Sequence, residues 1–355
     1  MQYIDTLKDN KNSAFFFVED YNGNYNYKTE YFYAVANFYY SKGLNVYMVH
    51  EKADYKIPYQ NYDKLVHISF EEISENKEIK ITPVDYIFVP EIYIEVVAQM
   101  RKQKVPAEII VVSQDYNKIF DPLEIGENWL MHGIKHVITV SEEQRKYLLD
   151  FFPSLDVRVL NPFVADDFIP ATEPRKPIVT FISGNERIVE NTVKKFQTKY
   201  TQYAWIPFKI ISPLSTADMA RQLKESACAV DLEEYSPFKL EALQAFKTKT
   251  PVIGLLPKLS LQWLNKEGKV KNNAVWTINE MQIIDFLALF IDKWVTDQLD
   301  DSVIETAYED ALPYSEEIFK NNLEDIFLDI KNKRISFLEG LAQPKQDVNT
   351  NDEAQ

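Results

Sequence analysis

Short apolar runs alternate with amphipathic segments along most of this chain. The apolar runs are too short for buried helices and predict buried strands, while apolar residues at i, i+3, i+4 and i+7, as in residues 29–43, predict helices. The predicted strands cover residues 13–19, 45–50, 85–90, 107–113, 135–141 and 157–162, and then 178–183, 208–212, 227–232 and 250–256. Continuous apolar strands separated by amphipathic helices indicate parallel sheets covered on both faces.

Three serine residues stand three positions before a Glu, Gln or Asp at the start of a predicted helix. This spacing is typical of a capping box, in which the serine hydroxyl accepts a hydrogen bond from the backbone of the first turn. It predicts N-caps at Ser141, Ser183 and Ser215.

The segment 161–177 contains four prolines and shows little periodicity, which is typical of a linker. Because the alternation of strands and helices restarts after it, we expect an α/β protein with two Rossmann-like, doubly wound domains facing across a cleft. The expected parts are an N-terminal domain (1–165), a linker (166–177), a C-terminal domain (178–310), helices that pack back on the N-terminal domain (311–341) and a disordered tail (342–355).

Composition and charge narrow the function classes. The 355 residues carry a formal net charge of −15, which argues against nucleic-acid binding, and no polybasic patch suggests docking on anionic lipid. Cys228 is the only cysteine, so no disulfide can form within the chain. The N-terminus has no signal-peptide pattern, and no apolar stretch reaches the length of a membrane span. We expect a cytoplasmic protein without a transmembrane segment; a peripheral position at the inner face of the membrane stays open.

Common catalytic signatures are missing. The chain has no D-x-D triplet, Walker loop, G-x-G-x-x-G or G-x-S-x-G motif. Its four histidines show no metal-ligand spacing, so we expect no metal and no cofactor. His50, at the carboxyl end of its predicted strand, is the histidine best placed to act as a base in a cleft.

The stretch DLEEYSPFKLEALQAFKTKTPVIG, residues 231–254, combines a strand end, a turn and a helix start. Glu233 follows the strand and Glu241 begins the helix, which gives an E-x7-E spacing. The free N–H groups of a helix start carry a partial positive charge that suits a diphosphate. Flanking carboxylates can accept hydrogen bonds from the hydroxyls of a sugar or ribose.

This stretch resembles the donor-binding signature of GT-B glycosyltransferases, in particular the retaining family 4. The segments HVITVSEEQRKYLLDFFP and VRVLNPFVADDFIP are similar to the end of that family's N-terminal domain and its linker. VVSQDYNKIFDP (111–122) resembles a rhamnosyltransferase-like subgroup. The resemblance extends over roughly residues 85–300.

The resemblance implies metal-independent transfer of a hexose or deoxyhexose from a nucleotide-sugar to a glycan or lipid-linked glycan acceptor. It implies retention at the anomeric carbon. By analogy with the family, Glu241 binds the ribose and Glu233 a sugar hydroxyl, and the backbone around Ser236, Pro237 and Phe238 lies close to the donor.

The chain departs from the family pattern where the leaving diphosphate is bound. The family has an Arg and a Lys soon after the first strand of the C-terminal domain, but here Arg187 is the nearby candidate, with Lys209 or Lys239 as substitutes. Glu234 is an alternative to the first glutamate of the pair. The glycine-rich loop of the N-terminal domain is reduced to Gly23.

Gln114 and Asp115 directly follow a predicted strand, so their side chains point toward the cleft. The resemblance implies contacts to acceptor or donor sugar, whereas the simpler interpretation is an Asx turn that ends the strand. Three alternative functions stay open: a catalytically degenerate GT-B protein acting as a binding or scaffold subunit, a two-lobed sugar-binding protein, and an epimerase on the same fold.

Overall fold

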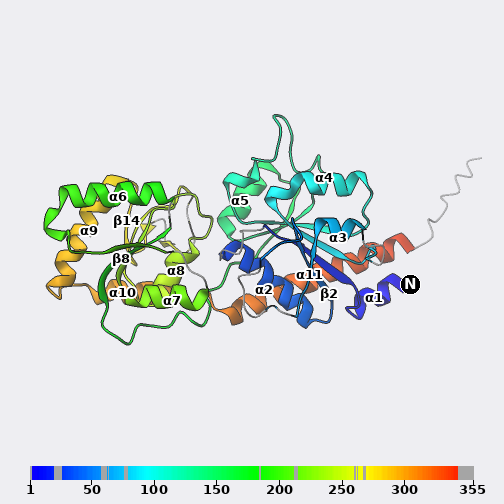
Figure 1. Ribbon diagram of the computed structural model, residues 1–355. Coiled ribbons are helices and arrows are strands. Elements are labelled where there is room, and N and C mark those ends of the chain that lie inside the picture. Colours follow the sequence, from blue (N-terminus) through cyan, green and yellow to red (C-terminus); the bar gives the residue numbers. More distant parts are fainter. Residues whose placement is uncertain are drawn as a thin grey trace, which may run out of the picture.

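The computed structural model has two α/β domains that lie side by side, each built around a central parallel sheet (Figure 1). It describes residues 2–19, 26–56, 62, 64–75, 79–183, 185–211, 215–259, 261, 263–266 and 269–342. Among these residues no helix is both long enough and apolar enough to cross a bilayer.

The N-terminal sheet has seven parallel strands in the order β3-β2-β1-β4-β5-β6-β7. The strands are β1 (Ser13–Phe17), β2 (Asn45–His50), β3 (Val66–Ser69), β4 (Tyr86–Pro90), β5 (Glu108–Ser113), β6 (His136–Thr139) and β7 (Asp156–Val159). Its order reverses between β1 and β4. In doubly wound sheets ligands bind beyond the carboxyl ends of the strands at such a point.

The C-terminal sheet has five parallel strands in the order β14-β11-β10-β8-β9. The strands are β8 (Lys176–Ser183), β9 (Phe208–Ile210), β10 (Ser226–Asp231), β11 (Val252–Leu255) and β14 (Val275–Thr277), and a separate hairpin pairs β12 (Asn265–Lys266) with β13 (Lys269–Val270). The order reverses between β8 and β10, so the second expected ligand position follows Ser183 and Asp231.

Helices cover both faces of each sheet. On the N-terminal domain, α3 (Phe70–Glu75), α4 (Ile94–Lys102) and α5 (Glu142–Phe151) cover one face, and α2 (Tyr27–Ser41) and α11 (Glu316–Ala342) the other, with α1 (Gln2–Lys8) against α11. On the C-terminal domain, α6 (Glu186–Lys199) and α9 (Glu280–Val295) cover one face, and α7 (Thr216–Glu225), α8 (Leu240–Lys247) and α10 (Asp301–Ala311) the other. Short 3₁₀ helices are η1 (Glu91–Tyr93), η2 (Asn117–Ile119) and η3 (Thr201–Tyr203).

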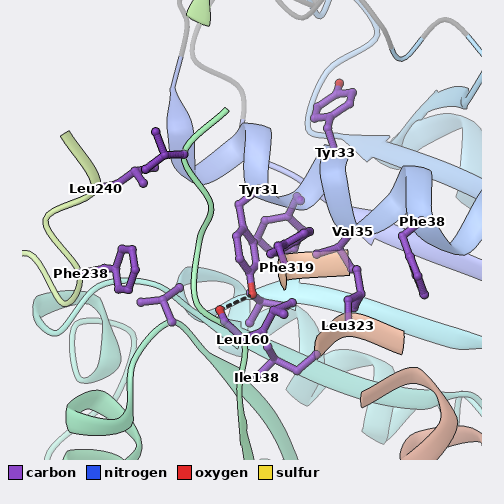
Figure 2. Packing of buried hydrophobic residues seen from close by; sticks show 14 of the residues in the cluster. Tyr31, Tyr33, Val35, Phe38, Ile138, Leu160, Phe238, Leu240, Phe319 and Leu323 are labelled. Atoms are coloured by element: carbon purple, nitrogen blue, oxygen red, sulfur yellow. Dashed lines mark hydrogen bonds between the residues drawn. The ribbon is translucent and has the colours of Figure 1, made fainter. Parts of the chain in front are cut away.

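One apolar cluster runs through both domains. It joins the α2 and α11 face of the N-terminal domain to α7 and α8 of the C-terminal domain. Figure 2 shows Phe238 and Leu240 approaching the group around Tyr31 and Phe319, where the Tyr31 hydroxyl donates to the Leu160 carbonyl oxygen over 3.0 Å. The two domains are therefore connected by shared apolar packing as well as by the chain.

Two of the three expected serine caps are confirmed. Ser141 and Ser215 each accept a backbone N–H three residues on, at 3.1 Å. The expected cap at Ser183 is wrong, because Ser183 is the last residue of β8 and Asn185 caps α6 by accepting from the Arg187 backbone N–H.

Gly254, in β11, provides a test of the packing between β11, Trp276 of β14 and the end of β10. A Cβ atom there would lie 2.5 Å from Cζ3 of Trp276 and 3.2 Å from the Asp231 carbonyl oxygen. We predict that Gly254→Ala lowers the free energy of unfolding by about 1–3 kcal/mol, because the core must shift to accept the methyl group. Urea unfolding monitored by circular dichroism measures the change.

Gly340→Ala is the matched control. Apart from its own stretch of α11, no atom of the described residues lies within 4 Å of a Cβ at Gly340. Since alanine is the better helix former, this variant is expected to be stabilised by up to about 1 kcal/mol. Equal stability of Gly254→Ala and the wild type would contradict the packing described here.

Candidate functional site

A cavity of about 320 Å³, here termed the interdomain pocket, lies at the carboxyl ends of the two sheets. Its walls come from both domains: Tyr27, Lys28, Asp115 and Asn117 from the N-terminal domain, and Ser183, Glu233, Tyr235, Ser236, Pro237 and Glu241 from the C-terminal domain. It includes the strand-order reversal between β8 and β10. The topology and the cavity therefore indicate the same position.

The turn between β10 and α8 is anchored by a buried ion pair. The Lys239 Nζ lies 2.8 Å from Asp231 Oδ2, and neither side chain is more than 2% exposed. The same ammonium group donates to the Glu233 carbonyl oxygen. Lys239 has φ +53°, a left-handed conformation that directs the chain into α8. The ion pair therefore sets the path of the whole turn.

Further hydrogen bonds fix Glu233 and Ser236 on this turn. The Glu233 backbone N–H donates to Asp231 Oδ1 at 3.0 Å and to Ser183 Oγ at 3.2 Å. Glu233 Oε1 accepts from the Tyr235 N–H at 2.7 Å, and Ser236 Oγ accepts from the Lys239 N–H at 2.8 Å. Much of the turn's backbone is thus satisfied internally, which holds Glu233 at the pocket wall.

Glu241 lies in the first turn of α8 and is half-buried. Burial raises the pKa of Glu241 to about 7, and the Asp231 carboxylate adds to the rise. At neutral pH this carboxyl group is consequently only partly ionised, so it adds less negative charge to the pocket than its residue type suggests.

The opposite wall carries an ion pair between Lys28 and Asp115. Their charged atoms lie 2.6 Å apart, and the side chains are 20% and 19% exposed. Burial alone would lower the pKa of Lys28, but the carboxylates of Asp115, Glu91 and Glu19 together outweigh it, so the pKa is raised. Among the described residues lining the pocket, Lys28 is the only lysine or arginine.

Tyr27 connects the two walls. Its side chain lies close to that of Ser236 in the other domain, and both line the pocket. Burial raises the pKa of Tyr27 well above its usual value, and the nearby carboxylates of Glu241, Asp115 and Glu233 raise it further. The hydroxyl therefore keeps its proton.

A buried acid, Glu91, lies behind this wall at the end of β4. Its Oε1 accepts from the Gln114 N–H at 3.0 Å, and burial raises the pKa of Glu91 to about 7. Gln114 in turn donates from Nε2 to the Lys28 carbonyl oxygen at 3.2 Å. Both residues position Lys28 without lining the interdomain pocket.

Five of the residues expected from the sequence line this pocket together: Asp115, Glu233, Ser236, Pro237 and Glu241. Asp115 also accepts from the Asn117 N–H at 3.0 Å, so the Asx turn considered as the simpler interpretation is present as well. Other expected residues lie elsewhere.

The cations expected to bind a diphosphate are not at the pocket wall. Arg187 is exposed on the first turn of α6, and Lys209 is exposed on β9. The ammonium group of Lys239, the other expected cation, is buried against Asp231.

The remaining expected residues have structural contacts. Glu234 pairs with Lys258 at 3.1 Å, and Phe238 is buried in the apolar cluster. His50 is buried, stacked on Tyr55 with ring centroids 3.8 Å apart. Gly23 lies outside the described residues.

Five lining residues were not anticipated: Tyr27, Lys28, Asn117, Ser183 and Tyr235. Tyr27 and Lys28 follow the first strand, a position that faces the cleft in a doubly wound sheet, and this was the available signal. Among the described residues, no three His, Cys, Asp or Glu side chains gather as a metal-binding group would.

Comparison with solved structures identifies the fold. Sucrose-phosphate synthase from Thermosynechococcus elongatus superposes with a TM-score of 0.63 at 12% identity, covering 91% of this chain and 100% of that one. The lipopolysaccharide outer core galactosyltransferase WaaB gives 0.58 at 11% identity, covering 90% and 100%. An alpha-glucosyltransferase bound to UDP and a 13-mer DNA gives 0.56 at 10% identity, covering 92% and 99%. The chain has the GT-B fold, as expected.

One relative is found by sequence. The alpha-1,6-glucosyltransferase of Actinobacillus pleuropneumoniae serotype 7 (strain AP76) is 24% identical over 187 residues. The match covers 50% of this chain and 55% of that protein, so the chain spans about half the length of this relative. No protein-family model matches the chain.

The anchoring role of Lys239 leads to a stability prediction. Lys239→Met keeps the side-chain length but leaves the Asp231 carboxylate buried without its cation. We predict that the free energy of unfolding falls by about 3–5 kcal/mol. Denaturant unfolding monitored by fluorescence measures it.

Lys249→Met is the matched control, because Lys249 also has a left-handed backbone, with φ +58°. Its ion pair with Glu305 is partly exposed, and such pairs contribute at most about 1 kcal/mol. If Lys239→Met costs no more than Lys249→Met, the buried pair does not anchor the turn.

Proposed function

We propose that this protein is a glycosyltransferase that takes its sugar from a nucleotide-sugar bound in the interdomain pocket. The observation that carries the proposal is the meeting of Glu233 and Glu241 with Lys28 of the other domain around one cavity, at the strand-order reversal of the C-terminal sheet. The GT-B fold supports it, since the solved structures that share the fold include named glycosyltransferases.

In this proposal Glu241 holds the nucleotide's ribose. A carboxylate at the start of α8 accepts hydrogen bonds from two neighbouring hydroxyls, and its half-buried position excludes part of the competing water. Because the pKa of Glu241 is about 7, its charge repels the adjacent diphosphate less than a fully ionised carboxylate would.

Glu233 orients the transferred sugar. Its backbone N–H is held by Asp231 and Ser183, so its position is set before any ligand arrives. A carboxylate fixed in this way binds a sugar hydroxyl without the cost of ordering a mobile side chain.

Lys28 stabilises the leaving diphosphate, in the role that the family pattern gives to an Arg and a Lys of the C-terminal domain. Its ammonium group is partly shielded from water, which strengthens its attraction for phosphate oxygens. Asp115 keeps Lys28 charged and holds it at the pocket until a donor binds.

The proposed reaction is metal-independent and retains the anomeric configuration. The bond between the sugar C1 and the diphosphate oxygen breaks, and its electron pair stays on the diphosphate. The acceptor hydroxyl oxygen bonds to C1 on the same face and passes its proton to the leaving phosphate oxygen. The acceptor, a glycan or a lipid-linked glycan, enters beside Asp115.

The two glutamates lead to different kinetic expectations. A thermal-shift panel of UDP, GDP, dTDP and their sugars first identifies the nucleotide that binds. We predict that Glu241→Ala weakens its affinity about tenfold to a hundredfold, through lost hydrogen bonds to a charged acceptor. Glu233→Ala is expected to slow the transfer reaction, measured as the rate at which nucleotide diphosphate is formed, about 10²-fold. The affinity for the nucleotide is expected to change little.

Glu234→Ala is the control, since Glu234 is adjacent in sequence but pairs with Lys258 away from the pocket. Its affinity and turnover are expected to match the wild type. Unchanged affinity in Glu241→Ala would refute the placement of the ribose. Tight nucleotide binding without turnover in the wild type would instead support the scaffold alternative.

A further inference from the structure

A second cavity, here termed the rear pocket, lies at the amino ends of strands of the N-terminal sheet, opposite the interdomain pocket. Its volume is about 580 Å³. Its walls include the starts of β5 and β6, part of β7, the end of α4 and the last turns of α11. Because the interdomain pocket is at the carboxyl ends of the strands, the proposed transfer reaction does not use this one.

Positive charge is concentrated at the rear pocket, although the chain as a whole is acidic. The lysine and arginine residues that line it are Arg101, Lys135, Arg158, Lys333 and Arg334. Three carboxylates pair with some of them, Glu108 in the wall and Asp156 and Asp329 beside it. His136 lies between two of these acids, 3.0 Å from Glu108 and 3.2 Å from Asp156. The cations outnumber the carboxylates.

Arg158 keeps one part of its guanidinium unused. Its side chain is only 9% exposed, and it bonds to Asp329 through Nε at 2.8 Å and to Asp156 through Nη2 at 2.9 Å. Its Nη1 is buried and has no hydrogen-bond partner among the described residues. Because this atom is closed off from solvent, Arg158 contributes positive charge to the wall of the rear pocket and not a hydrogen bond to a ligand.

Arg101 supplies accessible donors. Its Nε is buried, but its two terminal nitrogens are not, and within the described part of the chain they have no hydrogen-bond or ion-pair partner. Gly133, with φ +75°, lies against this side chain, and a Cβ there would come within 3.3 Å of Arg101 Cγ. The glycine thus leaves space for the arginine to lie in the wall.

Arg334 has a different role, because its donors are already used. It bonds to Glu108 at 2.7 Å and to the carbonyl oxygens of Pro83 and Pro106, which fastens α11 to the edge of the sheet. Its guanidinium lies over the Phe337 ring, 5.3 Å from the centroid. The available donors are therefore the terminal nitrogens of Arg101, with Lys135 exposed nearby.

The rest of the wall is apolar. Pro106, Ala107, Ile330 and Phe337 line the rear pocket, and Phe337 is 55% exposed at its opening. An inorganic anion would leave this apolar surface in contact with water. A ligand that joins an anionic head to an apolar body would cover it and use the free donors at once.

We propose that the rear pocket binds a phosphate ester with an apolar organic part. Arg101 binds the phosphate oxygens, for which the planar guanidinium group is well suited, Lys135 lies beside it, and Arg158 adds positive charge to the wall. The organic part lies against Ala107, Ile330 and Phe337. This site is separate from the donor site in the interdomain pocket and does not depend on the proposed transfer reaction.

Calorimetry with geranyl phosphate and with inorganic phosphate, at matched ionic strength, tests the proposal. We expect geranyl phosphate to bind more tightly. Vesicles containing phosphatidic acid, compared with neutral vesicles, show whether the ester is taken from a lipid surface or from solution. Binding in either form supports the site, and failure of the wild type to bind both overturns it.

Arg101→Gln is the principal variant, because it leaves the described ion pairs intact. Its affinity is expected to fall about tenfold or more, as for loss of a hydrogen bond to a charged group. Lys135→Gln, at an exposed position, should show a smaller loss and serves if the first variant folds poorly. Arg221→Gln makes the same chemical change on α7 of the other domain and should bind as the wild type does. Equal affinity of Arg101→Gln and Arg221→Gln would overturn the proposal.

Discussion

The buried ion pair between Lys239 and Asp231 is the interaction on which the candidate site depends. A left-handed residue is needed where the turn enters α8, and glycine would adopt that conformation at less cost. Glycine, however, would leave Asp231 buried without a cation. Lysine at this position costs about 1–2 kcal/mol in backbone energy and supplies the ammonium group that neutralises the carboxylate. Asp231 can then hold the Glu233 backbone in place, and the two glutamates of the turn end on one wall of the pocket.

The second requirement is that the two domains stay close enough to share a pocket. Apolar contacts supply it: Phe238 of the turn packs edge-to-face on Tyr314, just before α11, with ring centroids 5.2 Å apart. The helix α11 is in turn held on the N-terminal domain by contacts such as that of Phe319 with Tyr31, at 5.7 Å (Figure 2). Since Phe238 belongs to the same turn as Glu233, one side of the turn faces the apolar cluster and the other faces the pocket. The interface and the site are therefore built from the same short segment, which couples the position of the domains to the geometry of the candidate site.

Much of the fold could be predicted from the sequence. The pattern of apolar and polar residues shows which segments are buried, and in a doubly wound sheet the strands are buried on both faces while the helices are buried on one. The position of Glu233 and Glu241 was also accessible, since strand ends face the ligand in this topology. The directions in which the basic side chains point could not be predicted. Lys239 is identical in sequence terms to a surface lysine, and only its left-handed backbone and its contact with Asp231 reveal that it is buried. Likewise, Lys28 reaches the pocket because the N-terminal domain packs against the turn, a long-range contact that no local pattern encodes.

In the proposed function, a nucleotide-sugar binds between the turn of the C-terminal domain and Lys28 of the N-terminal domain. Hydrogen–deuterium exchange, measured with and without the nucleotide-sugar that most stabilises the protein, tests it most directly. We predict slower exchange in two peptides far apart in the sequence, one spanning residues 233–242 and one spanning residues 26–32. Protection in only one of them, in neither, or the lack of any nucleotide that binds would contradict it.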